Sequence, residues 1–163
     1  MKTLLLLRHA KSSWDDPVLP DHDRPLTERG KKDAKRIGRL LREFRLVPEL
    51  IVSSTAQRAR KTASKVAKAC GYTGEVEVAS RLYHAYSSQF IEVLREIGNQ
   101  HATVLVVAHN PGLEELVRHL TGQVETMPTA ALAQVSLDIE RWQDLIVPPG
   151  GRLLQAWRPK ELA

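Results

Sequence analysis

The chain has 163 residues, of which 42% are hydrophobic and 26% are charged, with a formal net charge of +5. This length and composition are typical of one globular domain, and we expect residues 1–163 to form a single one. Aromatic residues make up only 5% of the chain and do not alternate with a basic stripe, so we expect no nucleic acid partner. The lone cysteine, Cys70, cannot form an internal disulfide, which favours a reducing compartment, the cytoplasm.

Residues 3–7 are an apolar run that predicts a buried strand, and Arg8 follows it at once. The run is too short to span a bilayer or to form the core of a signal peptide, so we expect no membrane contact. The polar residues 10–26, with prolines at positions 17, 20 and 25, predict a long loop. In a compact domain such a loop is usually functional.

Hydrophobic periodicity predicts four helices, at residues 27–45, 55–69, 87–97 and 113–122. The same reasoning predicts further strands at residues 50–53, 75–78, 103–108, 133–139 and 152–157, the last two separated by a turn at 148–151. Thr27 is expected to cap the first of these helices, and Gly71 to end the second. This order predicts an α/β fold: a three-layer α/β/α sandwich with a mostly parallel central sheet, to which the C-terminal strands add an antiparallel edge.

Basic side chains follow three of the apolar strands directly or after a short turn: Arg8 and His9, Arg58, and His109. In an open α/β sheet, ligands bind at the carboxyl ends of the parallel strands, so we expect these side chains to meet at one place. A strand needs no arginine or histidine at its end in order to fold. Two guanidinium groups and two imidazoles suit a small dianion, and phosphate fits because arginine can bind it with two hydrogen bonds.

Phosphoryl transfer needs an in-line nucleophile and positive charge on the transferred group. His9 is the candidate nucleophile, because a neutral imidazole can attack phosphorus and nearby arginines favour the neutral form. Arg8, Arg58 and His109 would stabilise the charge that develops in the transition state.

Lys11 and Asn110 stand next to these residues and are candidate neighbours of the phosphate. The chain has neither a CxxC nor an HExxH motif. The segment Asp21-His22-Asp23 contains metal-ligating residue types, but a solvated turn is the favoured interpretation of these adjacent residues in a proline-flanked loop. We therefore expect no metal and no cofactor.

Four segments resemble, in the right order, the signatures of the histidine phosphatase (phosphoglycerate mutase-like) superfamily. They are Leu4 to Lys11, Leu26 to Gly30, Ser53 to Ala63, and Val107 to Gly112. The resemblance implies that His9 is the phosphorylated nucleophile, and that Arg8, Arg58 and His109 form the phosphate pocket.

Within this superfamily the small size, the Arg-His-Ala motif and Asn110 are most similar to SixA-type phosphohistidine phosphatases. Mutase-like members carry a glutamate acid in Arg-Leu-x-Glu, where this chain has Arg81-Leu82-Tyr83-His84. Acid-phosphatase members carry aspartate at the position of Asn110. His84 is therefore the candidate acid or substrate-binding residue.

Three functions remain open at this point. The first is a metal-independent phosphatase that works through a phosphohistidine intermediate on His9 and removes phosphoryl groups from phosphohistidine in proteins. It is favoured because a phosphoramidate needs little acid catalysis. The second is a broad phosphomonoesterase for small phosphorylated substrates, with His84 as its acid. The third is a non-catalytic module that binds a phosphorylated partner.

Overall fold

The computed structural model describes residues 1–145 and 150–162. The strands are β1 (Lys2–Arg8), β2 (Leu50–Ser53), β3 (Val76–Val78), β4 (Thr103–Ala108), β5 (Leu132–Leu137) and β6 (Gly151–Trp157). The α-helices are α1 (Glu28–Glu43), α2 (Gln57–Cys70), α3 (Ser87–Arg95) and α4 (Gly112–Thr121). Short 3₁₀ helices are η1 (Asp21–Asp23), η2 (Ser80–Leu82), η3 (Trp142–Asp144) and η4 (Pro159–Glu161).

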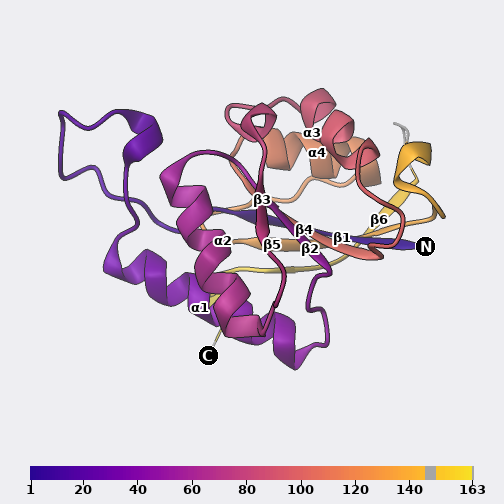
Figure 1. The fold of residues 1–163 in the computed structure, drawn as a ribbon, viewed down its shortest axis with the longest axis horizontal. Coiled ribbons are helices and arrows are strands. Elements are labelled where there is room, and N and C mark those ends of the chain that lie inside the picture. The colour runs from indigo at the N-terminus through magenta and orange to yellow at the C-terminus, as the bar shows by residue number, and fades with distance from the viewer. Residues whose placement is uncertain (146–149, 163) are drawn as a thin grey trace.

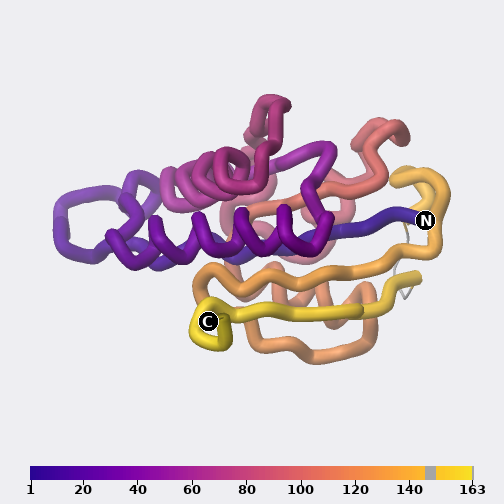
Figure 2. The backbone as a smooth tube through the Cα atoms, turned by 90° about the horizontal axis from the view of Figure 1, so that it is seen from below, coloured from indigo at the N-terminus to yellow at the C-terminus, as the bar shows by residue number. Residues whose placement is uncertain are grey.

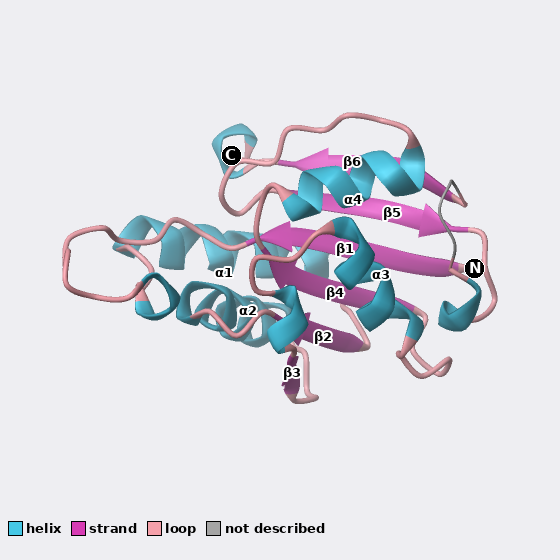
Figure 3. Cartoon of the chain, turned by 90° about the horizontal axis from the view of Figure 1, so that it is seen from above, coloured by secondary structure: helices cyan, strands magenta, loops and turns pink. Residues whose placement is uncertain are grey.

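The strands form one six-stranded sheet in the order β3-β2-β4-β1-β5-β6 (Figures 1 and 3). The first four pair in parallel, whereas β5 runs antiparallel to β1 and β6 antiparallel to β5. Figure 2 shows β5 and β6 side by side along their length. The predicted mostly parallel sheet with a C-terminal antiparallel edge is confirmed. Of the predicted turn at 148–151, residues 148 and 149 lie outside the described residues.

Helices cover both faces of the sheet, which gives the predicted three layers. Leu5 and Leu7 of β1 belong to the core cluster under α1 and α2. Leu4 and Leu6 face the opposite way, into the cluster under α3 and α4. All four leucines are fully buried. A strand covered on both faces must be apolar at every position, which is why β1 is a continuous leucine run with no alternation.

The helix ends follow local signals, with small differences from the sequence. The hydroxyl of Thr27 accepts a hydrogen bond from the Gly30 backbone N–H at 3.0 Å, as the predicted N-cap requires. The helix α1 ends two residues before the predicted Arg45, which has a φ of 56° and so leaves the helical region. Gly71, with a φ of 84°, ends α2 as predicted.

Two other boundaries are also corrected. The helix α2 begins at Gln57, not at residue 55. The hydroxyl of Ser54 accepts the Ala56 N–H at 3.2 Å and holds the turn before the helix. The helix α3 ends at Arg95, two residues earlier than predicted. Cys70 is buried at 3% exposure, as expected of a packed side chain.

The strand order brings the ends of β2, β4 and β1 together, because these strands are adjacent. Their registers end at the same level: Arg8 pairs with Ala108, and Ser53 with Val107. The segments that follow these strands therefore start from one edge of the sheet. The long loop after β1, residues 10–26, extends from this edge to one side of the fold (Figure 1). It folds back through a bridge between Ser12 and Leu26.

Candidate active site

The structure brings the four predicted side chains together at the ends of β1, β4 and β2. The rings of His9 and His109 lie with their centroids 5.1 Å apart. His9, His109 and Arg58 are 6%, 7% and 5% exposed, respectively. Arg58 and Arg8 both lie close enough to His9 to act on its ionisation. The result is a cluster of two imidazoles and two guanidinium groups, of which only Arg8 is partly exposed.

The hydrogen bonds of His9 fix which ring nitrogen is free. Its Nδ1 lies 2.8 Å from the Ala10 carbonyl oxygen, which can only accept, so Nδ1 carries the proton. Burial, together with the charges of Arg58 and Arg8, lowers the pKa of His9 from 6.5 to about 4. At neutral pH the ring is therefore uncharged, with its lone pair on Nε2. This is the protonation state that a nucleophilic imidazole requires.

Ser54, the residue after β2, performs a similar task for His109. Its hydroxyl oxygen lies 2.7 Å from His109 Nε2 and accepts the Ala56 backbone N–H. Among the described residues the Ser54 hydroxyl proton has no other acceptor than Nε2, and a hydrogen bond to Nε2 leaves the proton of the neutral imidazole on Nδ1. Burial and the proximity of His9 and Arg58 lower the pKa of His109 to about 3, so the ring is neutral. His109 thus offers an N–H donor without carrying a charge.

Three buried nitrogens of this cluster have no hydrogen-bond partner within the described part of the chain: Arg8 Nε, Arg58 Nε and His109 Nδ1. An orphaned buried donor costs roughly 1–3 kcal/mol. An anion that accepts hydrogen bonds from all three would remove this cost. The cluster therefore combines three donors that lack a partner with the free Nε2 of His9, an arrangement that suits the oxygens of an anion.

Asp21, in the loop after β1, holds the Arg58 side chain in place. Arg58 donates from Nη1 to the Asp21 carbonyl oxygen at 2.7 Å and from Nη2 to its Oδ2 at 3.1 Å. Tyr83 donates to the same Oδ2 at 2.6 Å, and Arg24 to Oδ1 at 3.1 Å. Although partial burial opposes the shift, hydrogen bonds from Tyr83 and Arg58 hold the pKa of Asp21 well below its usual range.

The interpretation of residues 21–23 as a solvated turn needs a correction for Asp21. The segment is a 3₁₀ helix, and the Asp21 side chain, although 40% exposed, is engaged by three other side chains. Within residues 1–145 and 150–162, no group of three or more His, Cys, Asp or Glu side chains is arranged to hold a metal ion. No sequence signal in the loop identified Asp21 as the partner of Arg58, because the contact depends on how the loop folds back.

Asn110 and Arg8 donate to the same carbonyl oxygen. The Asn110 side-chain N–H group donates to the Met127 carbonyl oxygen at 2.8 Å and to Glu114 at 3.0 Å. Arg8 donates from Nη1 to the same Met127 oxygen at 3.2 Å. Asn110 therefore supports the segment that orients Arg8. The predicted place beside the phosphate stays a hypothesis for Asn110.

His84 is exposed and lies at the rim of the cluster. Its ring packs on that of Tyr83, with centroids 3.9 Å apart, and Tyr83 in turn meets His109 at 5.6 Å. The backbone of His84 has a φ of 56°, an uncommon conformation for a non-glycine residue. The segment after His84 passes close to Gly112. A Cβ at position 112 would come 2.2 Å from the Ala85 carbonyl oxygen. A larger residue would displace the segment that carries His84.

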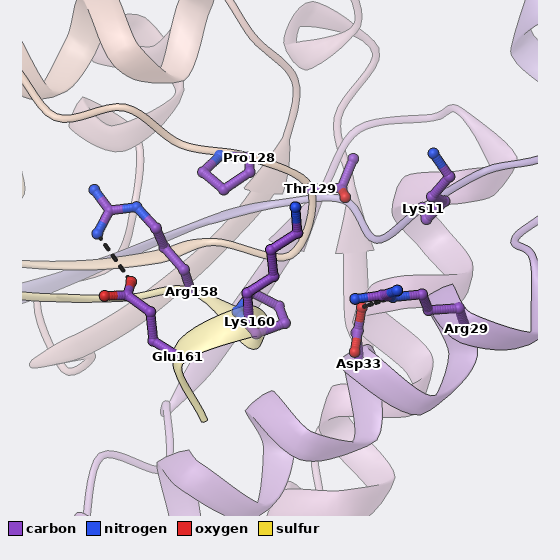
Figure 4. Close-up of a pocket in the computed structure, with 9 residues that line it drawn as sticks. Lys11, Arg29, Asp33, Pro128, Thr129, Arg158, Lys160 and Glu161 are labelled. Atoms are coloured by element: carbon purple, nitrogen blue, oxygen red, sulfur yellow. Dashed lines mark hydrogen bonds and ion pairs between the residues drawn. The ribbon is translucent and has the colours of Figure 1, made fainter. Parts of the chain in front are cut away.

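Lys11 does not join the cluster formed by Arg8, His9, Arg58 and His109. Its exposed side chain lines a cleft that also includes Arg29, Asp33 and Lys160 (Figure 4). Gly30 allows the loop to pass here, since a Cβ at this position would come 2.2 Å from the Lys11 carbonyl oxygen. Gly30, in the Leu26 to Gly30 motif, thus allows α1 to pack closely against the segment after His9.

Comparison with known proteins identifies the family of the chain. The family model of the histidine phosphatase superfamily (branch 1) matches residues 4–85. An uncharacterized chloroplastic protein of Arabidopsis thaliana is 33% identical over 165 residues, covering 94% of this chain and 76% of that protein. The chain belongs to the histidine phosphatase superfamily.

Solved structures agree over the full length of this superfamily member. The putative phosphohistidine phosphatase SixA from Nakamurella multipartitia superposes with a TM-score of 0.86 and 26% identity, covering 97% of this chain and 96% of that chain. The protein histidine phosphatase SixA in complex with tungstate superposes with a TM-score of 0.86 and 25% identity, covering 99% of both chains. The predicted SixA-like family and fold are confirmed.

The protein is therefore a hydrolase of the phosphatase class, and the non-catalytic alternative is set aside. Among the described residues, no helix is both long and apolar enough to cross a membrane. Asp21, Ser54 and Tyr83 join the predicted residues at the site. Ser54 lies inside a motif noted in the sequence, but its partner, His109, is 55 positions away.

Proposed function

We propose that this phosphatase removes phosphoryl groups from phosphohistidine in proteins, through a covalent phosphohistidine formed on His9. The observation that supports this most directly is the pairing of one free lone pair with three orphaned donors. His9 is neutral with Nε2 unprotonated, and Arg8 Nε, Arg58 Nε and His109 Nδ1 lack partners within the described residues. Nucleophile and anion-binding donors thus occur in one buried cluster.

In the first step, His9 Nε2 attacks phosphorus and the bond from phosphorus to the leaving group breaks. Arg8, Arg58 and His109 donate to the equatorial oxygens, where preorganised donors in a dry site give their largest effect. In the second step, water attacks the phosphorylated His9 and releases inorganic phosphate, which restores the neutral ring. The proton from the attacking water passes to the released phosphate or to solvent.

The leaving group decides how much acid catalysis is needed. When the far nitrogen of a phosphohistidine ring is protonated, the ring leaves as a neutral imidazole and takes the bonding pair with it. An alkoxide leaving group must instead receive a proton in the transition state. Asp21 is ionised and engaged by Tyr83, Arg58 and Arg24, so it is unsuited to supply one. This favours a P–N substrate over a phosphate ester.

Metal independence is part of the same proposal. Enzymes that transfer phosphoryl groups with Mg²⁺ use the ion to neutralise the charge on the phosphate oxygens. Here Arg8 and Arg58 supply two fixed positive charges at that position. Tungstate in the similar SixA structure is a tetrahedral oxyanion, and we infer that the same kind of anion binds this cluster.

Trapping of the intermediate tests the proposal. Enzyme mixed with ³²P-labelled phosphohistidine protein and quenched in alkali should carry label on His9, because phosphohistidine survives alkali. The His9→Ala variant should be folded but lack label and lose activity by several orders of magnitude. The matched control, His101→Ala, removes an imidazole away from the cluster and should retain both. A folded His9→Ala enzyme with appreciable activity would contradict the mechanism.

A substrate panel distinguishes the phosphohistidine phosphatase from the phosphomonoesterase. The panel compares phosphohistidine protein, phosphoramidate ion and an alkyl phosphate with the same enzyme. We expect kcat/KM to be highest for the P–N substrates. Because His84 lies at the rim beside Tyr83, His84→Ala should slow the alkyl phosphate if His84 is an acid and leave phosphoramidate nearly unchanged. A preference for the alkyl phosphate would favour the phosphomonoesterase instead.

A further inference from the structure

A second concave site lies next to the cluster of His9, and the mechanism proposed above does not use it. This cleft has a volume of about 500 Å³. Its walls come from the segment after β1, the first half of α1, the stretch before β5, and η4. The residues that line it are Lys11, Arg29, Asp33, Pro128, Thr129, Arg158, Pro159, Lys160 and Glu161 (Figure 4).

The cleft shares backbone with the catalytic strand end. Lys11 is two residues beyond His9, so their Cα atoms are at most about 7 Å apart. On the opposite wall, Thr129 precedes Ala130, whose backbone N–H donates to the Arg8 and His9 carbonyl oxygens, each at 3.1 Å. A chain whose phosphohistidine sits at His9 advances about 3.3 Å per extended residue. Residues roughly two to four positions away can therefore reach the cleft.

The carboxylates of the cleft are already neutralised. Asp33 is 3.8 Å from both Arg29 and Arg36. Glu161 lies 3.2 Å from Arg158, which also pairs with Glu125.

Two cations remain in excess. Within the described residues, no ion pair involves the ammonium groups of Lys11 or Lys160. Figure 4 shows the Lys160 side chain within the cleft, between Arg158 and the side formed by Lys11 and Arg29. Positive charge lining a concave surface concentrates the potential there and attracts anionic groups. Lysine ammonium groups suit single carboxylates, whereas Arg158, which could bind a phosphate with two hydrogen bonds, already donates to Glu125 and Glu161.

We propose that this cleft binds an acidic segment, with Asp or Glu side chains, that flanks the phosphohistidine of the protein substrate. This inference rests on the proposed function, because it names the protein that presents the phosphoryl group. The cleft is large enough for several side chains, and Pro128 and Pro159 supply apolar surface for their stems. Lys160 acts as a specificity residue that recognises the substrate without touching the phosphoryl group.

The test compares a short phosphohistidine peptide flanked by Asp and Glu with the same peptide carrying Asn and Gln. Wild-type enzyme should favour the acidic peptide by about tenfold in kcat/KM, mostly through KM, and the advantage should shrink at high salt. Lys160→Glu should abolish the advantage and leave phosphoramidate turnover unchanged. The matched control is Lys35→Glu, the same charge change at an exposed position of α1 outside the cleft, and it should behave as wild type.

Binding of the unphosphorylated acidic peptide, measured by calorimetry, separates this inference from the proposed function. Wild-type enzyme should bind it about tenfold more tightly than Lys160→Glu does. If the peptide binds in this way but its phosphorylated form is not hydrolysed, the proposed function fails and the docking cleft stands. Equal binding by the two proteins, or an equal loss of turnover on the peptide and on phosphoramidate in Lys160→Glu, would overturn the cleft proposal.

Discussion

Acidification should leave His9 in its reactive form far below the pH at which an ordinary imidazole becomes protonated. The perturbation is a change from pH 7 to pH 5. With burial and the two arginines lowering its pKa to about 4, about 90% of His9 stays neutral at pH 5, against about 3% of an imidazole with a pKa near 6.5. We expect NMR titration of the labelled ring to show a midpoint near pH 4.

The same shift has a cost in stability. Because the unfolded chain binds the proton at a higher pH than the folded chain does, the free energy of unfolding falls as the pH drops below about 6.5. For His9 the loss between pH 7 and pH 5 is about 2 kcal/mol, from the difference between a pKa of 6.5 and one of about 4. His109, with its pKa lowered to about 3, adds a loss of similar size.

Urea unfolding at several pH values measures this cost. The His9→Asn variant keeps a side-chain N–H for the Ala10 carbonyl oxygen but has no titrating ring. Its stability should fall by about 2 kcal/mol less than that of the wild type between pH 7 and pH 5. The lowered pKa of Asp21 adds its loss only below about pH 4, outside this window. Identical pH slopes for variant and wild type, or an NMR midpoint near 6.5, would refute the assignment of a buried neutral nucleophile.

Four other outcomes are expected. Arg58→Lys should keep the fold but lose at least about tenfold in kcat, since a single ammonium cannot hold both Asp21 and the phosphate; a wild-type rate would contradict this. Asp21→Asn should lower kcat by about tenfold while inorganic phosphate inhibits more tightly, because Arg58 loses its anchoring charge; unchanged values of both would remove Asp21 from the site. Ser54→Ala should lower kcat by about tenfold with little change in KM, because the His109 tautomer is no longer fixed; an unchanged kcat would show that another group fixes it. Chelator-treated enzyme should keep its full rate and be inhibited competitively by vanadate; restoration of lost activity by Mg²⁺ or Zn²⁺ would exclude the metal-independent mechanism.

The strand ends could be predicted from the sequence because each depends on a local pattern. An apolar run followed by Arg8 and His9 needs only the rule that such runs are buried strands with ligands at their carboxyl ends. The same reasoning applies to His109, after the β-branched run of β4. Because β2, β4 and β1 are adjacent in the sheet, the side chains that follow these three strands meet in one cluster.

The supporting residues could not be predicted because they depend on contacts between distant segments. Asp21 reaches Arg58 across 37 positions, through a loop whose course is set by η1 and by the Arg24 contact with Ser12. Local composition instead favoured a solvated turn. The start of α2 was misplaced by two residues for a related reason, since the side-chain hydrogen bond that Ser54 accepts from the Ala56 N–H holds the turn before the helix.

The leucines that made β1 predictable also affect His9, the proposed nucleophile. Helices cover both faces of this strand, so its last residues are also buried. His9 follows Leu7 by only two positions and is buried with them. Desolvation there is the largest cause of its lowered pKa, ahead of the charges of Arg58 and Arg8. A more polar strand would leave the ring hydrated and partly protonated, and a protonated imidazole cannot attack phosphorus. The hydrophobic pattern therefore shapes the chemistry of the site as well as the fold.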